Sequence, residues 1–137
     1  MRKIAQLGLF LVLLPGLNSA AFAQEEMPQN YAYFALEPDI ITNYLGQSAR
    51  KLGFVRVTME LMLEDISFLE AAEHHSPLMR ATVIEIFGRQ PEEKVKSLIG
   101  REAIRRSCLE SLREIMKNET GSETVKDVIF TKYLYQG

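Results

Sequence analysis

Hydrophobic and polar residues alternate most regularly over residues 54–63. Every second residue from Val55 to Leu63 is apolar, whereas Arg56, Thr58 and Glu60 between them are polar. Successive side chains of a strand point to opposite faces, so a period of two predicts a strand with one buried face and one face in water.

Aromatic and β-branched residues predict three more stretches of strand. Residues 31–36 and 39–45 form two of them, with Pro38 as an interruption, and residues 125–135 form the last. Residues 46–53 lie between strands and predict a turn.

The pattern changes to helical spacing after residue 63. Asp65 is placed to cap a short helix over residues 66–75. Ser76 and Pro77 predict a second helix, with a capping hydroxyl followed by Pro at the first helical position. Its apolar residues recur at i, i+4, i+7 and i+8 before Gly88 ends it: Met79, Val83, Ile86 and Phe87.

A third helix start is predicted at Pro91, where Glu92 and Glu93 favour the helix dipole. Two apolar clusters then point in different directions. Val95, Leu98, Ile99 and Ala103 form the first, and Ile104, Cys108, Leu112 and Ile115 form the second. This phase change predicts a break beside Gly100, followed by a helix of roughly 18 residues to Asn118. Strands, then helices, then a strand define the α+β class.

The first 23 residues have the pattern of a secretory signal peptide. Arg2 and Lys3 precede an apolar run over residues 4–17, and Ala21 and Ala23 form an A-x-A site with cleavage before Gln24. The alternative is an uncleaved anchor, because residues 4–23 are about as long as a membrane span. In both cases the rest of the chain crosses the membrane, with residues 24–30 as a linker and residues 31–137 as the exported domain.

Composition and charge narrow the classes of function. The chain has 137 residues, 47% of them hydrophobic and 25% charged, which is typical of one folded domain. Beyond residue 23 it carries 14 basic and 18 acidic residues, a net charge of −4, which argues against a nucleic-acid binder. The single cysteine, Cys108, excludes an internal disulfide; we interpret it as a buried apolar residue rather than a nucleophile or an interchain bridge.

Candidate catalytic chemistry is absent from the sequence pattern. His74 and His75 are adjacent and point about 100° apart on a helix, so they do not form an i, i+4 metal pair. The carboxylates are scattered, and no phosphate-binding or nucleophile motif occurs. We therefore predict no catalytic, cofactor or metal site.

One charged cluster is a candidate interaction face. Arg101, Arg105 and Arg106 lie on the last helix, with Arg113 two turns beyond Arg106. Arginine-rich helix faces pair with carboxylates at interfaces or approach anionic lipid headgroups. The alternative is a solvent face balanced by Glu102 and Glu110.

From residue 77 onward the order of motifs resembles the FliL family of bacterial flagellar basal-body-associated proteins. Pro77 and Arg80 precede the helix with VIEIF, and Gly100, Arg101 and Glu102 open the last helix. The closing segment, residues 125–136, resembles the family pattern V-x-x-V-x-F-T-x-F-x-x-Q through Val128, Phe130, Thr131 and Gln136. With the strand over residues 54–63, the resemblance covers residues 31–137.

The resemblance implies a non-enzymatic periplasmic domain with a stomatin-like (SPFH-like) fold, an antiparallel sheet packed against three to four helices. It implies association with the flagellar basal body and the stator proteins MotA and MotB at the inner membrane, support of flagellar rotation, swimming or swarming motility and chemotaxis, and a homo-oligomeric ring. A stomatin-like scaffold for another inner-membrane complex is the alternative.

Two features depart from the family pattern. The chain has almost no cytoplasmic tail before its apolar segment, and Arg113 stands where the family has Asn.

Overall fold

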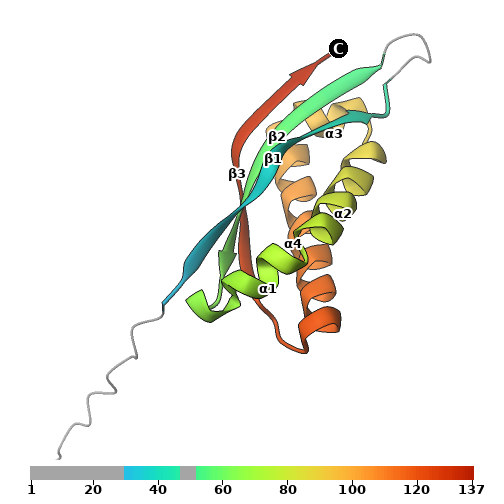
Figure 1. Ribbon diagram of the computed structural model, residues 1–137. Coiled ribbons are helices and arrows are strands. Elements are labelled where there is room, and N and C mark those ends of the chain that lie inside the picture. Colours follow the sequence, from blue (N-terminus) through green and yellow to red (C-terminus); the bar gives the residue numbers. More distant parts are fainter. Residues whose placement is uncertain (1–29, 47–51) are drawn as a thin grey trace, which may run out of the picture.

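A computed structural model describes residues 30–46 and 52–137 (Figure 1). The signal sequence, with Ala21, Ala23 and Gln24, and nearly all of the linker lie outside these residues, so those assignments stay predictions. The described chain is α+β: three strands, β1 (Ala32–Tyr44), β2 (Gly53–Leu63) and β3 (Val125–Gln136); a short 3-10 helix, η1 (Ile66–Phe68); and four α-helices, α1 (Leu69–His74), α2 (Ser76–Gly88), α3 (Glu92–Lys96) and α4 (Leu98–Thr120).

The three strands form an antiparallel sheet in the order β1-β2-β3. The central strand therefore pairs with a neighbour close in sequence and with one that follows all the helices. Leu63, for example, lies opposite both Ala32 and Val125. The helices lie along one side of the sheet, with α2 and α4 running beside it (Figure 1).

The core lies between this sheet face and the helices. The alternating residues of β2 from Val55 to Leu63 are fully buried there, as their period predicts. The apolar stripe of α2, and Ile104, Cys108 and Leu112 of α4, are also buried, which confirms the predicted inward faces of both helices.

Pro38 does not interrupt the first strand, so the expectation of two separate segments was wrong. The β1–β2 pairing shifts register between Leu36 and Ile40 and then continues. Asp39, inside this irregularity, accepts hydrogen bonds from Thr58 Oγ1 at 2.8 Å and from Arg56 Nε at 2.8 Å. These two donors lower the pKa of Asp39 and connect β1 to β2 by side chains where the register shifts.

The helix starts are partly as predicted. Asp65 Oδ1 accepts from the backbone N–H of Ser67 at 2.8 Å, which confirms Asp65 as a cap, although the segment it starts is divided into η1 and α1. Pro77 lies in the first turn of α2, but Ser76 is already helical and makes no side-chain cap. The neighbouring α1 leads directly into α2 through His75, which leaves no extended residue at which a hydroxyl could cap.

The break between α3 and α4 lies at Ser97, three residues before Gly100. Ser97 has an extended backbone and its Oγ accepts from the N–H of Gly100, so α4 is longer than predicted and runs on to Thr120. The prediction that Leu98 and Ile99 share a buried cluster with Val95 was wrong: Val95 is buried, whereas Leu98 and Ile99 are 75% and 87% exposed. Gly100 turns instead toward the backbone of Lys94, where only a hydrogen fits.

Candidate interaction site between α4 and β3

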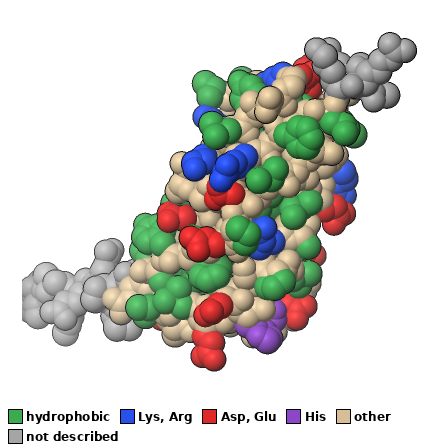
Figure 2. Space-filling view, turned by 45° about the horizontal axis from the view of Figure 1, so that its top comes forward, with side chains coloured by type: hydrophobic (Ala, Val, Ile, Leu, Met, Phe, Trp, Pro, Cys, Tyr) green, Lys and Arg blue, Asp and Glu red, His purple; other side chains and the backbone are tan. Residues whose placement is uncertain are grey.

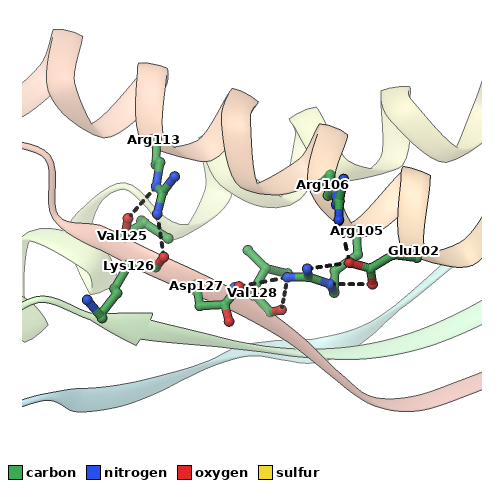
Figure 3. A network of polar contacts seen from close by, with 8 residues as sticks. All are labelled: Glu102, Arg105, Arg106, Arg113, Val125, Lys126, Asp127 and Val128. Atoms are coloured by element: carbon green, nitrogen blue, oxygen red, sulfur yellow. Dashed lines mark hydrogen bonds and ion pairs between the residues drawn. The ribbon is translucent and has the colours of Figure 1, made fainter.

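The side of α4 next to its buried stripe faces β3, the strand at one edge of the sheet. Ile104, Cys108 and Leu112 anchor α4 in the core, and Val125 and Val128 anchor β3. Arginines flank this packed seam, so their guanidinium groups reach the outward backbone groups of β3 (Figure 3).

Arg105 is the centre of a polar network that joins the helix to the strand (Figure 3). It contacts Glu102 on its own helix at 2.6 Å and Asp127 of β3 at 2.7 Å. Its Nη1 also donates to the backbone carbonyl of Val128 at 3.2 Å. One guanidinium thus binds Glu102 through two nitrogens and also reaches Asp127 and a main-chain acceptor, four contacts in all, whereas an ammonium has only three N–H donors.

Arg113 makes a second connection two turns further along α4. Its Nε donates to the carbonyl of Val125 at 2.9 Å and its Nη2 to the carbonyl of Lys126 at 2.5 Å. The departure from the family pattern at this position therefore supplies two contacts to β3. Together Arg105 and Arg113 donate to three carbonyls in the first half of β3 and so fix α4 to this edge strand.

The three predicted site residues, Arg101, Arg105 and Arg106, have different surroundings. Arg105 is mostly engaged within the fold, as described. Arg106 is 72% exposed in its side chain and contacts only Glu102, at 3.4 Å, among the ion pairs of the described residues. Arg101 lies 5.2 Å from the centre of the Tyr133 ring, a cation–π arrangement. An interaction role for this face stays a prediction, and Arg106 is its most accessible cation.

A shallow groove of about 480 Å³ lies beside the network. The first turns of α4 form one wall through Arg101, Glu102 and Arg105. The middle of β3, from Asp127 to Thr131 together with Tyr133, forms the other. The groove therefore offers alternating charges next to an apolar strand, which suits a protein surface better than a small apolar ligand.

The contact between Glu102 and Arg105 shifts the pKa of each. Hydrogen bonds from Arg105, with a smaller contribution from Arg106, lower the pKa of Glu102 to about 2. Glu102 in turn raises the pKa of Arg105, although burial opposes this. Both charges are therefore held over the whole physiological range.

The other residues considered for chemistry are Cys108, His74 and His75. Burial raises the pKa of the Cys108 thiol to about 12, which makes it a poor nucleophile. His74 and His75 contact each other edge to face, with ring centres 4.9 Å apart at the end of α1. Within residues 30–46 and 52–137, no three His, Cys, Asp or Glu side chains are grouped to hold a metal.

The residues that resemble the family motifs connect elements of the fold. Arg80 of α2 donates to the carbonyl of Pro38 in β1. Phe130 packs near Phe87 and Tyr133, and Thr131 Oγ1 donates to the carbonyl of Thr58 at 3.3 Å. Val128 is buried, and the carbonyl of Gln136 accepts from Tyr44 Oη at 3.4 Å. The contacts of these residues hold β1, β2, β3 and α2 together, so packing explains why the motif residues are needed for the fold.

Sequence reasoning missed Asp127 and the two carbonyls bound by Arg113. No local signal marks them, because their partners are 22 and 12 or more residues away and meet only when α4 lies along β3. No described helix combines the length and the apolar content needed to cross a membrane.

The fold and site define a small α+β protein with a network of charged side chains between helix α4 and the edge strand β3. A family model, "Flagellar basal body-associated protein FliL", matches residues 33–136, so the chain belongs to this family. It is also 25% identical over 109 residues to a "Flagellar protein FliL" of Aquifex aeolicus (strain VF5), an alignment that covers 80% of this chain and 64% of that relative. The chain thus spans somewhat less than two thirds of that relative's length. The family is one of flagellar basal-body-associated proteins, and its description names no enzymatic activity.

Proposed function

We propose that this protein is a non-enzymatic accessory component of the flagellar motor on the periplasmic side of the inner membrane. In this role it associates with the stator proteins MotA and MotB and supports rotation, swimming and swarming motility, and through them chemotaxis. The family match over residues 33–136 carries this proposal, because it spans β2, β3, every described helix and all of β1 except its first residue. The groove between α4 and β3 supports a role in protein contacts.

The proposed location depends on the N-terminal segment. A signal peptide cleaved after Ala23 releases the domain into the periplasm, whereas an uncleaved anchor holds it at the inner membrane. Mass spectrometry of the protein from fractionated cells distinguishes the two: Gln24 as the first residue supports cleavage, and an intact segment in membranes supports the anchor. Recovery of the whole chain in the cytoplasm would contradict both.

A deletion strain tests the motor role. We expect reduced swimming and swarming in viscous medium, with normal flagellar filaments, and recovery when the gene is restored. Cross-linking in wild-type cells is expected to capture MotA or MotB. Normal motility together with cross-links to a different membrane complex would contradict the motor role and favour the alternative, a stomatin-like scaffold elsewhere.

We also propose that the domain has the stomatin-like arrangement and self-associates into a ring, with Arg106 at the contact. R106E reverses an exposed charge that pairs with Glu102 one helical turn away. R89E is a matched control, because Arg89, directly after α2, is similarly exposed and pairs with Glu85 four residues earlier. R106E is expected to reduce oligomer size in light scattering while R89E leaves it unchanged; equal sizes for both would exclude this face.

A further inference from the structure

Four segments build the end of the molecule opposite the start of β1, which we call the distal end: residues 43–46, 52–56, 88–101 and 132–137 (Figure 1). Hydrogen bonds hold these segments together. The N–H of Leu45 donates to the carbonyl of Gln90 at 2.9 Å, and the N–H of Glu92 donates to the carbonyl of Leu45 at 3.1 Å. Tyr133 Oη donates to the carbonyl of Val95 at 2.7 Å, which fixes α3 to β3.

Large apolar side chains are concentrated on the surface of the distal end. Leu98 and Ile99 are adjacent and are the two most exposed large hydrophobic residues of the described chain. Leu45 and Leu52, also of the distal end, are 57% and 64% exposed. Single exposed apolar side chains are ordinary, but an adjacent pair at the first turn of a helix, with more nearby, marks a surface that meets another body.

Basic and acidic side chains are unequally distributed between the distal end and the rest of the described chain. The described residues of the distal end carry six basic side chains and two acidic ones: Arg56, Arg89, Lys94, Lys96, Arg101 and Lys132, with Glu92 and Glu93. The remaining described residues carry six basic and fourteen acidic side chains. Figure 2 shows this gradient: Lys and Arg gather mostly in the half beside the grey loop, and Asp and Glu mostly toward the other half. Arg56, Arg89 and Lys96 pair with Asp39, Glu85 and Glu92, whereas Lys94, Arg101 and Lys132 form no ion pair within 4.0 Å among the described residues. An acidic protein thus has an apolar end that carries three cations outside any such ion pair.

We propose that the distal end docks on an anionic phospholipid bilayer, with Leu98 and Ile99 entering the boundary between headgroups and acyl chains and the surrounding Lys and Arg contacting lipid phosphates. Charge complementarity carries the choice of partner. Cations flanking protruding apolar side chains match an anionic interface, and the acidic body is repelled by the same surface, which orients the distal end toward it.

Vesicle binding by the exported protein, in the form that cells produce, tests the proposal. Vesicles of phosphatidylethanolamine and phosphatidylglycerol are compared with vesicles of phosphatidylcholine alone. L98S/I99S is expected to bind the anionic vesicles on the order of tenfold more weakly than wild type. I66S is the matched control, because Ile66 is equally apolar, 58% exposed and lies at the opposite end beside Asp65. Any lipid affinity of residues 1–23 is common to all variants.

The charged part of the surface is tested separately. K94E is expected to weaken binding to anionic vesicles several-fold, since each basic residue near an anionic surface contributes about as much as a fivefold change. Raising the salt concentration is expected to weaken wild-type binding more than K94E binding. Equal binding to both vesicle types, unaffected by K94E and by salt, would overturn the proposed role of the cations.

A site-specific probe locates the contact. A polarity-sensitive dye on I99C is expected to shift to the blue on anionic vesicles and to be quenched by a lipid-attached quencher, whereas the dye on I66C is not. Cys108 is buried with a raised pKa, so labelling of the folded protein is confined to the introduced thiol. A dye at residue 99 that stays in water, or L98S/I99S binding as tightly as I66S, would overturn the proposal and leave an acidic protein as the partner of this end.

Discussion

Replacing Gly100 with Ala tests whether the close approach of α3 and α4 determines how the two helices are arranged. A Cβ at Gly100 would lie 2.2 Å from the carbonyl oxygen of Lys94 and 2.4 Å from its Cα. Both are backbone atoms, which cannot rotate aside as a side chain does. At Gly88, by contrast, the nearest atom to an added Cβ is the carbonyl oxygen of Asn43 at 3.9 Å, an ordinary contact.

The two substitutions share every effect except this contact. Both glycines lie in helices and neither has a positive φ, so G88A and G100A gain about 0.4–1 kcal/mol from the reduced entropy of the unfolded chain. Overpacking at Gly100 costs about 1–3 kcal/mol or more, because α3 must move away from α4. The free energy of unfolding is therefore expected to fall by about 1–2 kcal/mol in G100A and to rise by about 0.5 kcal/mol in G88A.

Urea unfolding followed by circular dichroism measures both changes. In a chain of this size 1 kcal/mol corresponds to roughly 3–6 °C in the melting temperature, so a thermal scan also separates the variants. If G100A and G88A move the urea midpoint in the same direction, the fit of α4 against the Lys94 backbone is not what requires a glycine, and the reasoning fails.

Three further results are expected. R113Q loses both contacts of a charged donor to β3 carbonyls and is expected to lower the free energy of unfolding by about 2 kcal/mol. The control K117Q removes only an exposed ion pair at 3.9 Å and is expected to change this free energy by less than about 0.5 kcal/mol. Equal losses in the two variants would contradict the role of the β3 carbonyls. The pKa of Glu102 is lowered to about 2, so the contribution of its charge to stability is complete above its ordinary pKa and is lost as pH falls toward 2. Between pH 5 and pH 2 the urea midpoint of E102Q is therefore expected to fall less than that of the wild type. Equal falls in the two midpoints would refute this. Cys108 is expected to react with a thiol reagent only at the rate of unfolding, and rapid reaction under native conditions would show that its burial is transient.

The strand and helix faces could be predicted because burial follows a local period. The alternation over β2 and the inward residues of α2 needed no knowledge of partners. The prediction that Pro38 interrupts the first strand was wrong for a different reason. The sequence shows that Pro38 lacks a backbone N–H donor, but it does not show that the side chains of Arg56 and Thr58 bind Asp39 across the irregularity. Those contacts depend on the pairing of two strands.

The break before α4 was predicted in kind but not in place, for a similar reason. The phase change of apolar residues is visible in the sequence, whereas the cap at Ser97 and the tight contact of Gly100 with Lys94 depend on how α3 folds back. The candidate site followed the same rule. The spacing of Arg101, Arg105 and Arg106 identified a charged helix, but only the tertiary arrangement assigns Arg105 to Asp127 and leaves Arg106 exposed.

The position of β3 in the chain has a consequence for folding. The central strand β2 pairs with β3 only after the chain has passed through all the helices, so Leu63 and Val125 close a loop of about sixty residues. Until β3 arrives, β2 has one unpaired edge, and a chain that emerges from a ribosome or a translocation channel keeps that edge open until β3 has followed the helices out. Folding of this sheet is therefore tied to the delivery of the twelve-residue strand β3, and truncation within β3 removes a partner of the central strand β2.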